Sequence, residues 1–569
     1  MYILGINCFG HDASAALIHD GRIIAAAEEE RFSRKKHDGW LPALAIQYCL
    51  QEGGVDAADI SQIAYYWNPW IEPQQIIRHV LRYFPKSLQL FRGASLHYPF
   101  LKRYPCMVRL RHLLRKVFPF RSNVSVVYVD HHHAHAASFF LSPFAAANVL
   151  VVDGIGEWST SSFYVGQGNR LTLLRNIQFP HSLGFLYSAI THHLGFQPNS
   201  DEWKVMALAS YGDPQVLREA FADLVHLETD GTFQLNLHYF DYHLRGAQRW
   251  VSDRFVRCFG AARVRDTSLT PHHMNIAAAL QSRFEEAMSH MVQALCVESG
   301  LPDLVLTGGC ALNCVANAKL QVRGGVGQTY VPFSPADSGT SIGAALYLYH
   351  HLLDRVRVPA TASPYLGPAY SDAAIEQAVA LAGLSWERID DIYAETARRL
   401  EEGQIGGWFQ GRMEFGPRAL GNRSIIADPR VAQMRDIINA KVKFRESFRP
   451  LAPSVTVEAQ TQFFAGDMQS PYMSFAPLST VIGRQRIPAT IHVDHTARLQ
   501  SVSQSMNERW WRLLKAFESR TGIPVILNTS FNVQGEPIVC SPTDALRCFH
   551  HASLDFLVLG DYLIARGAN

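Results

Sequence analysis

The feature that most constrains the fold is a strand–turn–strand block that occurs twice in the first third of the chain. Within residues 2–27, short apolar runs are separated by turn residues at 10–14 and by an Asp20-Gly21 turn. A second block, at residues 149–165, contains VVDGIGEWSTSSFYV. Small and polar residues at the tip of such a hairpin can wrap a phosphate with backbone N–H groups. The repeat predicts a duplicated α/β domain with a nucleotide cleft between its halves.

The length of the chain, 569 residues, exceeds what one ordinary hydrophobic core supports, so at least two domains are expected. Hydrophobic periodicity predicts a long amphipathic helix at 274–301, a strand at 304–306 and a buried helix at 340–353. The segment 358–372, VPATASPYLGPAYSD, is typical of a linker. We therefore predict a first domain at residues 1–360, a linker at 361–372 and a second domain at 373–569.

Composition excludes several classes of protein. The net charge of +2 lacks the basic excess of a dedicated nucleic-acid binder. The nine cysteines form no CxxC pair, which favours free thiols in a reducing cytosol over a disulfide framework. The sequence opens without a signal-peptide pattern, and no apolar run reaches the roughly 20 residues of a membrane span. We expect a soluble cytoplasmic enzyme with neither a membrane nor a nucleic acid as its partner.

The motif DHHHAHAASF, which begins at Asp130, predicts a metal-binding helix. It follows a strand-like run, and Asp130 is a good N-cap, so His131 should open a helix. His131 and His135 then share one helix face, and two neutral imidazoles at this spacing can grip one divalent metal ion. His132 and His133 point away from that face and are weaker candidates.

Two aspartates can complete such a site. Asp153 follows an apolar run and so lies at a strand end, whereas Asp337 lies in the turn FSPADSGTSIG just before a helix. Each aspartate alone is a common turn or cap residue, and HxxxH alone equally fits a polar helix start. Together they predict a site of two His and two Asp, suited to Fe(II), Mn(II) or Zn(II); spacing does not choose among these metals.

A glycine pair indicates a nucleotide site nearby. In TGGCALNCVAN, Gly308 and Gly309 lie between a strand and a helix, where a nucleotide can approach the backbone at the positive end of the helix. A structural turn is the alternative, since such pairs are common in turns. We interpret Cys310 and Cys314 as packing residues and not as ligands.

The predicted second domain concentrates cationic side chains among glycines and prolines. GWFQGRMEFGPRALGNRSIIADPR, at residues 407–430, carries four arginines, and bidentate phosphate binding is a good reason for such a cluster. Further along the chain come the motif Lys443-Phe444-Arg445 and, after an apolar strand, the motif Ser530-Phe531-Asn532. The pattern predicts an anion-binding site, and a cationic surface patch is the weaker alternative.

A strongly basic stretch also needs an interpretation. Residues 73–129 contain no Asp or Glu and eleven Lys or Arg residues interleaved with aromatics. A solvated helical face is the favoured interpretation; an anionic substrate, a partner or a dimer contact is the alternative. We expect acceptor specificity to reside in residues 67–121 and in the loops at 195–200 and 238–254.

Taken together, the motifs resemble one family over the whole chain. GxNxxxHDASAALxxDG, EEERFSRKKH, DHHHAHAAS, VVDGxGEW, EWKVMALASYG, TGGCALNCVAN and SPADSGTSIGAAL resemble, in the same order, the O-carbamoyltransferases of antibiotic and nodulation-factor biosynthesis. The resemblance implies a homodimer whose N-terminal domain has an actin/hexokinase-like fold, similar to the tRNA threonylcarbamoyl-transfer enzymes. It implies an Fe(II)-type metal bound by His131, His135, Asp153 and Asp337. It implies nucleotide binding by Lys204, Gly308, Gly309 and Asn313.

The resemblance also implies catalytic groups. His11, with Asp12 beside it, matches a family position that activates the acceptor hydroxyl; a turn histidine is the alternative for His11. The KxR and SxN motifs resemble the YrdC fold, an α+β domain that joins a carbamoyl group to AMP with Lys443 and Ser530 in catalytic positions. The anion-binding set that this second resemblance implies is Arg418, Lys443, Arg445, Arg449, Arg498, Ser530 and Asn532.

The predicted activity is therefore ATP-dependent O-carbamoyl transfer. Carbamoyl phosphate and ATP, with Mg²⁺ held mainly by phosphates and water, would give carbamoyl-adenylate in the second domain. The first domain would then transfer the carbamoyl group to a hydroxyl of a small natural product or sugar. Three alternatives rank lower: a hydrogenase-maturation carbamoyltransferase, a tRNA threonylcarbamoyl transferase and a sugar-kinase-like ATPase. The first carries its domains in the opposite order, the second needs RNA affinity, and the third leaves the KxR and SxN motifs unexplained.

Overall fold

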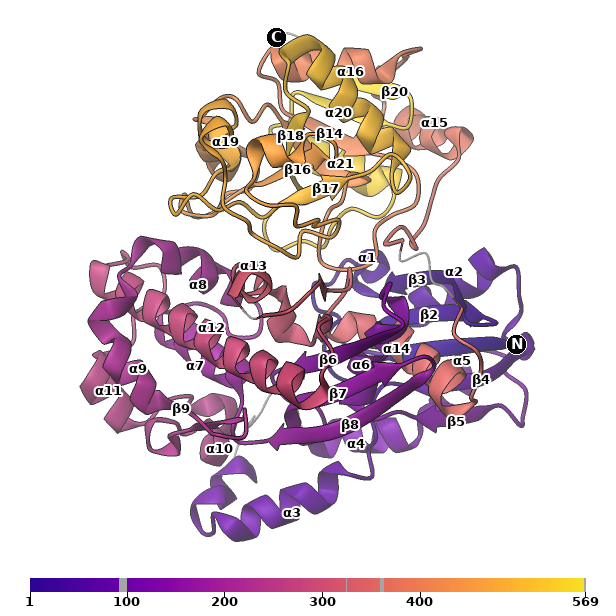
Figure 1. The fold of residues 1–569 in the computed structure, drawn as a ribbon. Coiled ribbons are helices and arrows are strands. Elements are labelled where there is room, and N and C mark those ends of the chain that lie inside the picture. The colour runs from indigo at the N-terminus through magenta and orange to yellow at the C-terminus, as the bar shows by residue number, and fades with distance from the viewer. Residues whose placement is uncertain (92–99, 324, 359–362, 567–569) are drawn as a thin grey trace. The chain divides into compact units, whose positions relative to one another are not determined.

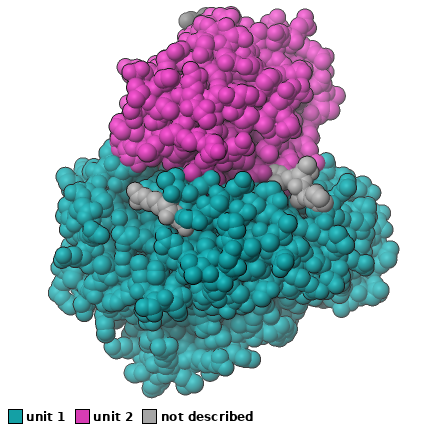
Figure 2. Space-filling model, in the orientation of Figure 1, with its two compact units in different colours: residues 1–29, 38–362 teal, residues 30–37, 363–569 magenta. Residues whose placement is uncertain are grey.

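The computed structural model describes residues 1–91, 100–323, 325–358 and 363–566. The chain divides into two compact units: residues 1–29 with 38–362, and residues 30–37 with 363–569 (Figure 2). Residues 30–37 lie in the second unit because their arginines bind its backbone. Arg31 donates to the carbonyl of Gly416 at 2.8 Å, and Arg34 donates to the carbonyl of Ile538 at 2.7 Å. No motif predicted that residues 30–37 would join the second unit.

The boundary between the two units, at residues 362 and 363, falls within the predicted linker 361–372, and the described part of this segment packs against the second unit. Residues 361 and 362 lie outside the described residues, but Leu366 is buried in the second unit. The N–H of Gly367 donates to the carbonyl of Met413 at 2.9 Å, and the Tyr365 hydroxyl donates to the carbonyl of Leu420, also at 2.9 Å. Composition favoured a free connection, but these tertiary contacts fix the segment.

The first unit contains two five-stranded sheets. The first sheet has the order β3-β2-β1-β4-β5, and the second has the order β8-β7-β6-β11-β12. The strands of the first sheet are β1 Tyr2–Asn7, β2 Ser14–His19, β3 Arg22–Glu28, β4 Ile60–Tyr65 and β5 Ser125–Tyr128. Those of the second are β6 Ala146–Val152, β7 Ser159–Gln167, β8 Arg170–Gln178, β11 Leu304–Thr307 and β12 Thr329–Tyr330.

The two sheets share one topology. In the first sheet, β2 pairs antiparallel with both β1 and β3, and in the second sheet, β7 pairs antiparallel with both β6 and β8. β4 then pairs parallel with both β1 and β5, and β11 pairs parallel with both β6 and β12. The duplicated α/β domain predicted from the two hairpin blocks is therefore present. The Asp20-Gly21 turn has the positive φ angles, 47° and 80°, that a tight two-residue hairpin requires.

Two short helices lie between the sheets of the first unit (Figure 1). They are α6 His131–Ala136, which contacts β6 and β7, and α14 Thr340–Leu346, which contacts β1, β2 and β4. Glycines let α14 pack backbone against backbone. A Cβ on Gly343 would lie 1.8 Å from the Ala134 carbonyl oxygen of α6, and a Cβ on Gly5 of β1 would lie 1.9 Å from that of Ser341. These contacts fix the two helices, and the side chains at their ends, against both sheets.

The remaining helices of the first unit pack around the sheets (Figure 1). The helix predicted at 274–301 is α12, Pro271–Ser299, and the one predicted at 340–353 is α14 followed by a π-helical turn, Tyr347–Leu352. Within the described residues, no helix combines the length and apolar character that spanning a membrane requires. The other helices of seven or more residues are α2 Ala43–Gly53, α3 Glu72–Arg82, α4 Phe100–Val108, α5 Leu110–Val117, α7 Leu183–His193, α8 Glu202–Leu208, α9 Arg218–Leu224, α11 Asp253–Phe259 and α13 Cys314–Arg323.

The second unit is built on one mixed eight-stranded sheet of order β13-β20-β19-β14-β15-β18-β16-β17. One core cluster joins the sheet to α15 Asp372–Leu381 and α21 Pro542–His551, and a second joins it to α16 Ile392–Glu401 and α20 Glu508–Thr521. The strands are β13 Glu387–Arg388, β14 Gly406–Phe409, β15 Arg423–Ala427, β16 Ala452–Thr456, β17 Gln500–Val502, β18 Val525–Ser530, β19 Phe556–Leu559 and β20 Tyr562–Ala565. The shorter helices are α1 Glu30–Ser33, α17 Met434–Ile437, α18 Gln460–Phe463 and α19 Val481–Arg486. The unit is thus a mixed α+β domain.

Candidate metal centre and anion-binding site

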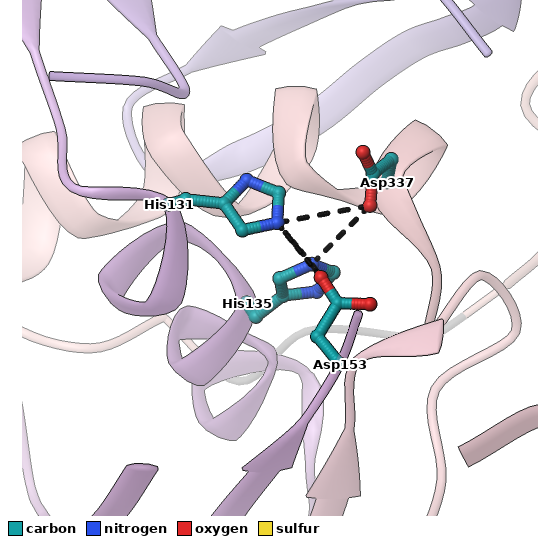
Figure 3. Close-up of side chains that lie close together, drawn as sticks. All are labelled: His131, His135, Asp153 and Asp337. Carbon is teal, nitrogen blue, oxygen red and sulfur yellow. Dashed lines mark hydrogen bonds and ion pairs between the residues drawn. The ribbon is translucent and has the colours of Figure 1, made fainter. Parts of the chain in front are cut away.

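Four side chains of the first unit converge at one point (Figure 3). The ligand atoms of His131, His135, Asp153 and Asp337 all lie within 4.8 Å of one another, and all four residues are buried. His131 Nε2 lies 3.0 Å from Asp153 Oδ2 and 3.1 Å from His135 Nε2. Asp337 Oδ1 lies 3.7 Å from the Nε2 atoms of both histidines. The sequence grouped these four residues, and the structure brings them together.

Helix α6 presents the two histidines as their i, i+4 spacing predicts. His132 turns away and its Nδ1 lies 2.7 Å from the Ser162 hydroxyl, while His133 Nδ1 lies 3.5 Å from Asp130 Oδ2. Asp130 occupies the N-cap position, but its side chain makes no capping hydrogen bond. It accepts instead from the Asn68 amide at 2.9 Å. The prediction of a helix start was right, and the prediction that the Asp130 side chain caps it was wrong.

The carboxylate that binds the first backbone N–H of α6 belongs to Glu157. Its Oε1 accepts from the N–H of His131 at 2.9 Å and from the N–H of Asn68 at 2.7 Å. Burial and the neighbouring Asp130 carboxylate raise the pKa of Glu157 to about 8. Sequence reasoning missed Glu157, although it stands in the VVDGxGEW motif.

The two aspartates are held by other chain segments. Asp153, at the end of β6, accepts from the N–H of Gly309 at 3.1 Å. A Cβ on Gly309 would lie 2.9 Å from the same Asp153 Oδ1, so glycine permits this approach. Asn7, at the end of β1, donates its amide to the Asp337 carbonyl at 2.8 Å and is fully buried. Asn7 was also missed, and the GxNxxxHD motif is the signal that could have found it.

Electrostatics couple the acids and imidazoles of this cluster. Burial opposes the charged form of His135, but hydrogen bonds to Asp153 and Asp337 outweigh it and raise its pKa to about 9. Burial likewise opposes the charged form of Asp153, and the two histidines hold its pKa well below the ordinary value. His132 shows the opposite behaviour, because burial and the neighbouring His131 lower its pKa.

The donor set fits a divalent transition metal. Two imidazole nitrogens and two carboxylates are hard-to-borderline ligands, and the convergence of two Nε2 atoms on one point suits Fe(II), Mn(II) or Zn(II). A cation there would offset two buried carboxylates.

His11 borders this cluster. Its Nδ1 lies 3.0 Å from Asp12 Oδ2, its Nε2 lies 3.6 Å from Asp337 Oδ2, and its side chain is 44% exposed. Burial disfavours the imidazolium, but the carboxylates of Asp337 and Asp12 outweigh it and raise the pKa of His11 to about 10. A histidine that is half open to solvent and beside the ligand cluster can reach a bound substrate.

The predicted nucleotide residues have structural roles. A Cβ on Gly308, which has φ of 91°, would lie 2.3 Å from the Val152 carbonyl oxygen, so this glycine allows two strand ends to meet. Asn313 exchanges amide hydrogen bonds with Gln281 at 2.9 and 3.0 Å. Lys204 is buried, with Nζ 3.2 Å from Asp201. These contacts fix the three residues in place, and nucleotide binding by them stays a prediction.

In the second unit, Lys443 lies at the centre of the predicted KxR and SxN site. Its Nζ donates to the Asn532 Oδ1 and carbonyl oxygens, both at 2.8 Å, and to the Ser530 carbonyl. The Ser530 hydroxyl donates to Asn532 Oδ1 at 2.7 Å and lies 3.4 Å from Lys443 Nζ. Burial, and then the charge of Arg445, lower the pKa of Lys443 well below its ordinary value. The two motifs, about 90 positions apart in sequence, therefore form one site.

Three further predicted residues act on this site through their charge. Burial, followed by the charges of Arg449 and Arg498, lowers the pKa of Arg445. Arg445 Nε donates to Asn439 Oδ1 at 2.7 Å. Arg418 is half-buried. The cluster thus collects positive charge, as an anion site requires.

Other arginines of the 407–430 run have backbone or carboxylate partners, which corrects their interpretation as phosphate ligands. Arg423 is fully buried and donates to the carbonyls of Gln410 and Pro368 at 2.6 and 3.0 Å. Arg412 donates to the carbonyl of Leu366 at 2.7 Å, and Arg430 binds both oxygens of Asp428. Composition alone cannot distinguish a carbonyl-binding arginine from a phosphate-binding one.

The basic stretch at 73–129 is only partly a solvated face. Arg78, Arg82, Arg111 and Arg115 are exposed, as the favoured interpretation predicts. Arg103, in contrast, is buried, donates to both Glu72 oxygens at 2.7 and 2.8 Å and stacks over Trp67. Residues 92–99 lie outside the described residues.

Comparisons with known proteins decide the family. The family described as carbamoyltransferase N-terminus matches residues 2–346, and carbamoyltransferase C-terminus matches residues 397–566. This chain belongs to the carbamoyltransferase family. The carbamoyltransferase is 37% identical to nodulation protein NolNO of Sinorhizobium fredii, over 98% of this chain and 80% of that protein. It is 41% identical to an uncharacterized protein of Synechocystis, over 100% of this chain and 97% of the other.

Two solved structures align with part of the carbamoyltransferase at low TM-scores. HypF of T. kodakarensis aligns with a TM-score of 0.31 and 12% identity over 63% of this chain and 49% of HypF. Component A of (R)-2-hydroxyglutaryl-CoA dehydratase from Acidaminococcus fermentans gives 0.32 and 16% over 61% of this chain and 98% of that one. These likenesses are too weak to assign function, so the enzyme's activity rests on the family match, which shows carbamoyl transfer.

Proposed function

We propose that this carbamoyltransferase works in two steps, in two sites of one chain. The observation that carries the proposal is the pair of opposite clusters: acids and imidazoles around His131 in the first unit, and cations around Lys443 in the second. The first suits a metal ion and the second suits phosphate groups. In this proposal the second unit has a YrdC-like role.

In the first step, carbamoyl phosphate and ATP, with one water consumed, give carbamoyl-adenylate, phosphate and pyrophosphate. Mg²⁺ would accompany ATP, held mainly by its phosphates and water. The ammonium of Lys443 and the guanidinium groups of Arg445, Arg449 and Arg498 would offset the negative charge that gathers as carbamate oxygen and phosphorus approach. Ser530 and Asn532 orient Lys443 through the hydrogen bonds described above.

In the second step, an acceptor hydroxyl oxygen bonds to the carbamoyl carbon and AMP departs. His131, His135, Asp153 and Asp337 would hold the metal ion, which supplies Lewis-acid polarisation. His11, once a cation offsets the Asp337 charge that raises its pKa, would take the hydroxyl proton at its Nε2 atom, with Asp12 holding Nδ1. The acceptor is a hydroxyl of a small natural product or sugar.

A carbamoyl-phosphate omission assay tests the proposal. Purified protein with ATP and Mg²⁺ should release pyrophosphate only when carbamoyl phosphate is present, because adenylate formation needs both. A protein that consumes ATP on an acceptor without carbamoyl phosphate would be a kinase, and the proposal would fail. Metal analysis of the same preparation tests the other site, where about one ion per chain is expected for a single four-ligand set.

A further inference from the structure

One buried carboxylate beside the metal cluster is not used by the proposed reaction. Glu157 lies on the loop between β6 and β7, four positions after Asp153 and 6% exposed. The same loop lies directly against α6, since a Cβ on Gly156 would be 3.2 Å from His131 Cβ and 3.0 Å from His132 Cδ2. One loop therefore bears a proposed ligand at one end and touches a second proposed ligand at the other.

The hydrogen bonds of Glu157 join three segments. Oε1 accepts from the N–H of His131 and from the N–H of Asn68, which lies in the loop after β4, and Oε2 is 3.2 Å from the N–H of His131. The first N–H groups of a helix lack partners within the helix, and an isolated six-residue helix is marginal in water. The carboxyl group supplies a partner that the Asp130 side chain does not.

We propose that Glu157 is a positioning residue of the carbamoyl-transfer site, which sets His131 against Asp153 by holding the first turn of α6. This inference rests on the proposed metal centre. Trp67 and Tyr66 pack against the His131 ring, with ring centroids 5.1 and 5.4 Å away, and so restrict its rotation. The position of the ring therefore depends on where the backbone of the first turn lies. A shift of the first turn would therefore change the His131–Asp153 distance, which is 3.0 Å.

The chain offers a matched control for the experiment. Asp130 directly precedes His131, and its sequence position predicts the capping role. Asp130→Ala and Glu157→Ala therefore compare the expected cap with the observed one. The full-length protein is titrated with Mn²⁺ alone, and the free aquo ion is followed by electron paramagnetic resonance. Loss of a partner that orients a metal ligand should weaken Mn²⁺ binding about 10- to 100-fold in Glu157→Ala.

Two more variants separate capping from folding. Glu157→Gln keeps an oxygen that accepts both N–H groups, so its Mn²⁺ affinity should stay within about threefold of wild type, and Asp130→Ala should behave likewise. Glu157→Asp is one methylene shorter and should bind as weakly as Glu157→Ala. Circular dichroism checks that each variant folds; if Glu157→Ala does not, Glu157→Asp and Glu157→Gln carry the comparison.

The possible results are distinct. Wild-type affinity in a folded Glu157→Ala or Glu157→Asp overturns the inference, and so does an equal loss in Asp130→Ala. A Glu157→Gln variant as weak as Glu157→Ala also overturns it. Wild-type protein that binds no Mn²⁺ would instead remove the metal centre itself, and the carbamoyl-phosphate-dependent release of pyrophosphate would still report on the second unit.

Discussion

The two candidate sites gather charge in opposite ways. In the first unit, acids and imidazoles alternate, so that Asp153 and His135 stabilise each other's charged forms. In the second unit, cations gather with cations, and burial together with Arg445 disfavours the charged form of Lys443. A metal ion entering the first cluster must displace imidazole protons, whereas an anion entering the second relieves repulsion between its donors. The first cluster therefore suits a cation, and the second suits an anion.

The largest effect should come from breaking the first cluster. His135→Ala removes one of four ligand positions, so metal content should fall below one-tenth of wild type and carbamoyl transfer should fall about 1000-fold or more. Pyrophosphate release should be unchanged, because Lys443 and its partners lie in the other unit. His133→Ala, on the same helix but outside the cluster, is the control and should keep both activities. Loss of both half-reactions in a folded His135→Ala would contradict the division into two sites.

The next effect tests the second cluster. Lys443→Ala deletes the buried ammonium, and removal of one preorganised electrostatic group typically costs about 100- to 1000-fold in rate. We expect that loss in carbamoyl-phosphate-dependent pyrophosphate release, with metal content normal. Lys441→Ala, an exposed lysine two positions earlier, is the matched control. Equal losses in the two variants would show that overall positive charge, and not the Ser530–Asn532 site, is responsible.

A further prediction concerns the stability of the first unit at acidic pH. Burial, and then His79, lower the pKa of His243 in the first unit to about 3. In the unfolded chain this residue titrates near 6.5, so between pH 6.5 and 3 the unfolded state binds more protons and stability falls as pH falls. His243 should contribute a loss of about 2 kcal/mol by pH 5. His243→Phe should flatten the decline in denaturant midpoint between pH 7 and 5; an unchanged slope would exclude His243 as its source.

The features of the two sites that the sequence predicted depend on short-range patterns within one helix or strand. The i, i+4 spacing of His131 and His135 places both on one face of α6, and the apolar run before Asp153 ends in the cluster, as strand geometry requires. The repeated hairpins predicted the duplicated sheets for the same reason, since a turn signal between apolar runs acts over a few residues.

The part that sequence did not predict depends on contacts between distant segments. Asp130 has the right position for a cap, but the loop that brings Glu157 to the helix follows another strand. The local sequence around Arg423 predicts a phosphate ligand, because it shows the guanidinium donors but not their acceptors. Those acceptors are the carbonyls of Gln410 and Pro368. The excursion of residues 30–37 into the second unit likewise depends on carbonyl partners some 400 to 500 positions away.

The smallest expected effect is that of Ser530→Ala, which tests the role of this hydroxyl in the second site. Ser530→Ala removes a hydroxyl that lies 3.4 Å from Lys443 Nζ, but Asn532 still holds that ammonium through two contacts at 2.8 Å. Loss of one long hydrogen bond among several typically costs about 0.5 to 1.5 kcal/mol, so pyrophosphate release should fall only about 3- to 10-fold. A steady-state comparison with Lys443→Ala checks this ranking. If Ser530→Ala were as damaging as Lys443→Ala, the hydroxyl would contact the reacting groups directly, and its role as an orienting partner of the lysine would be wrong.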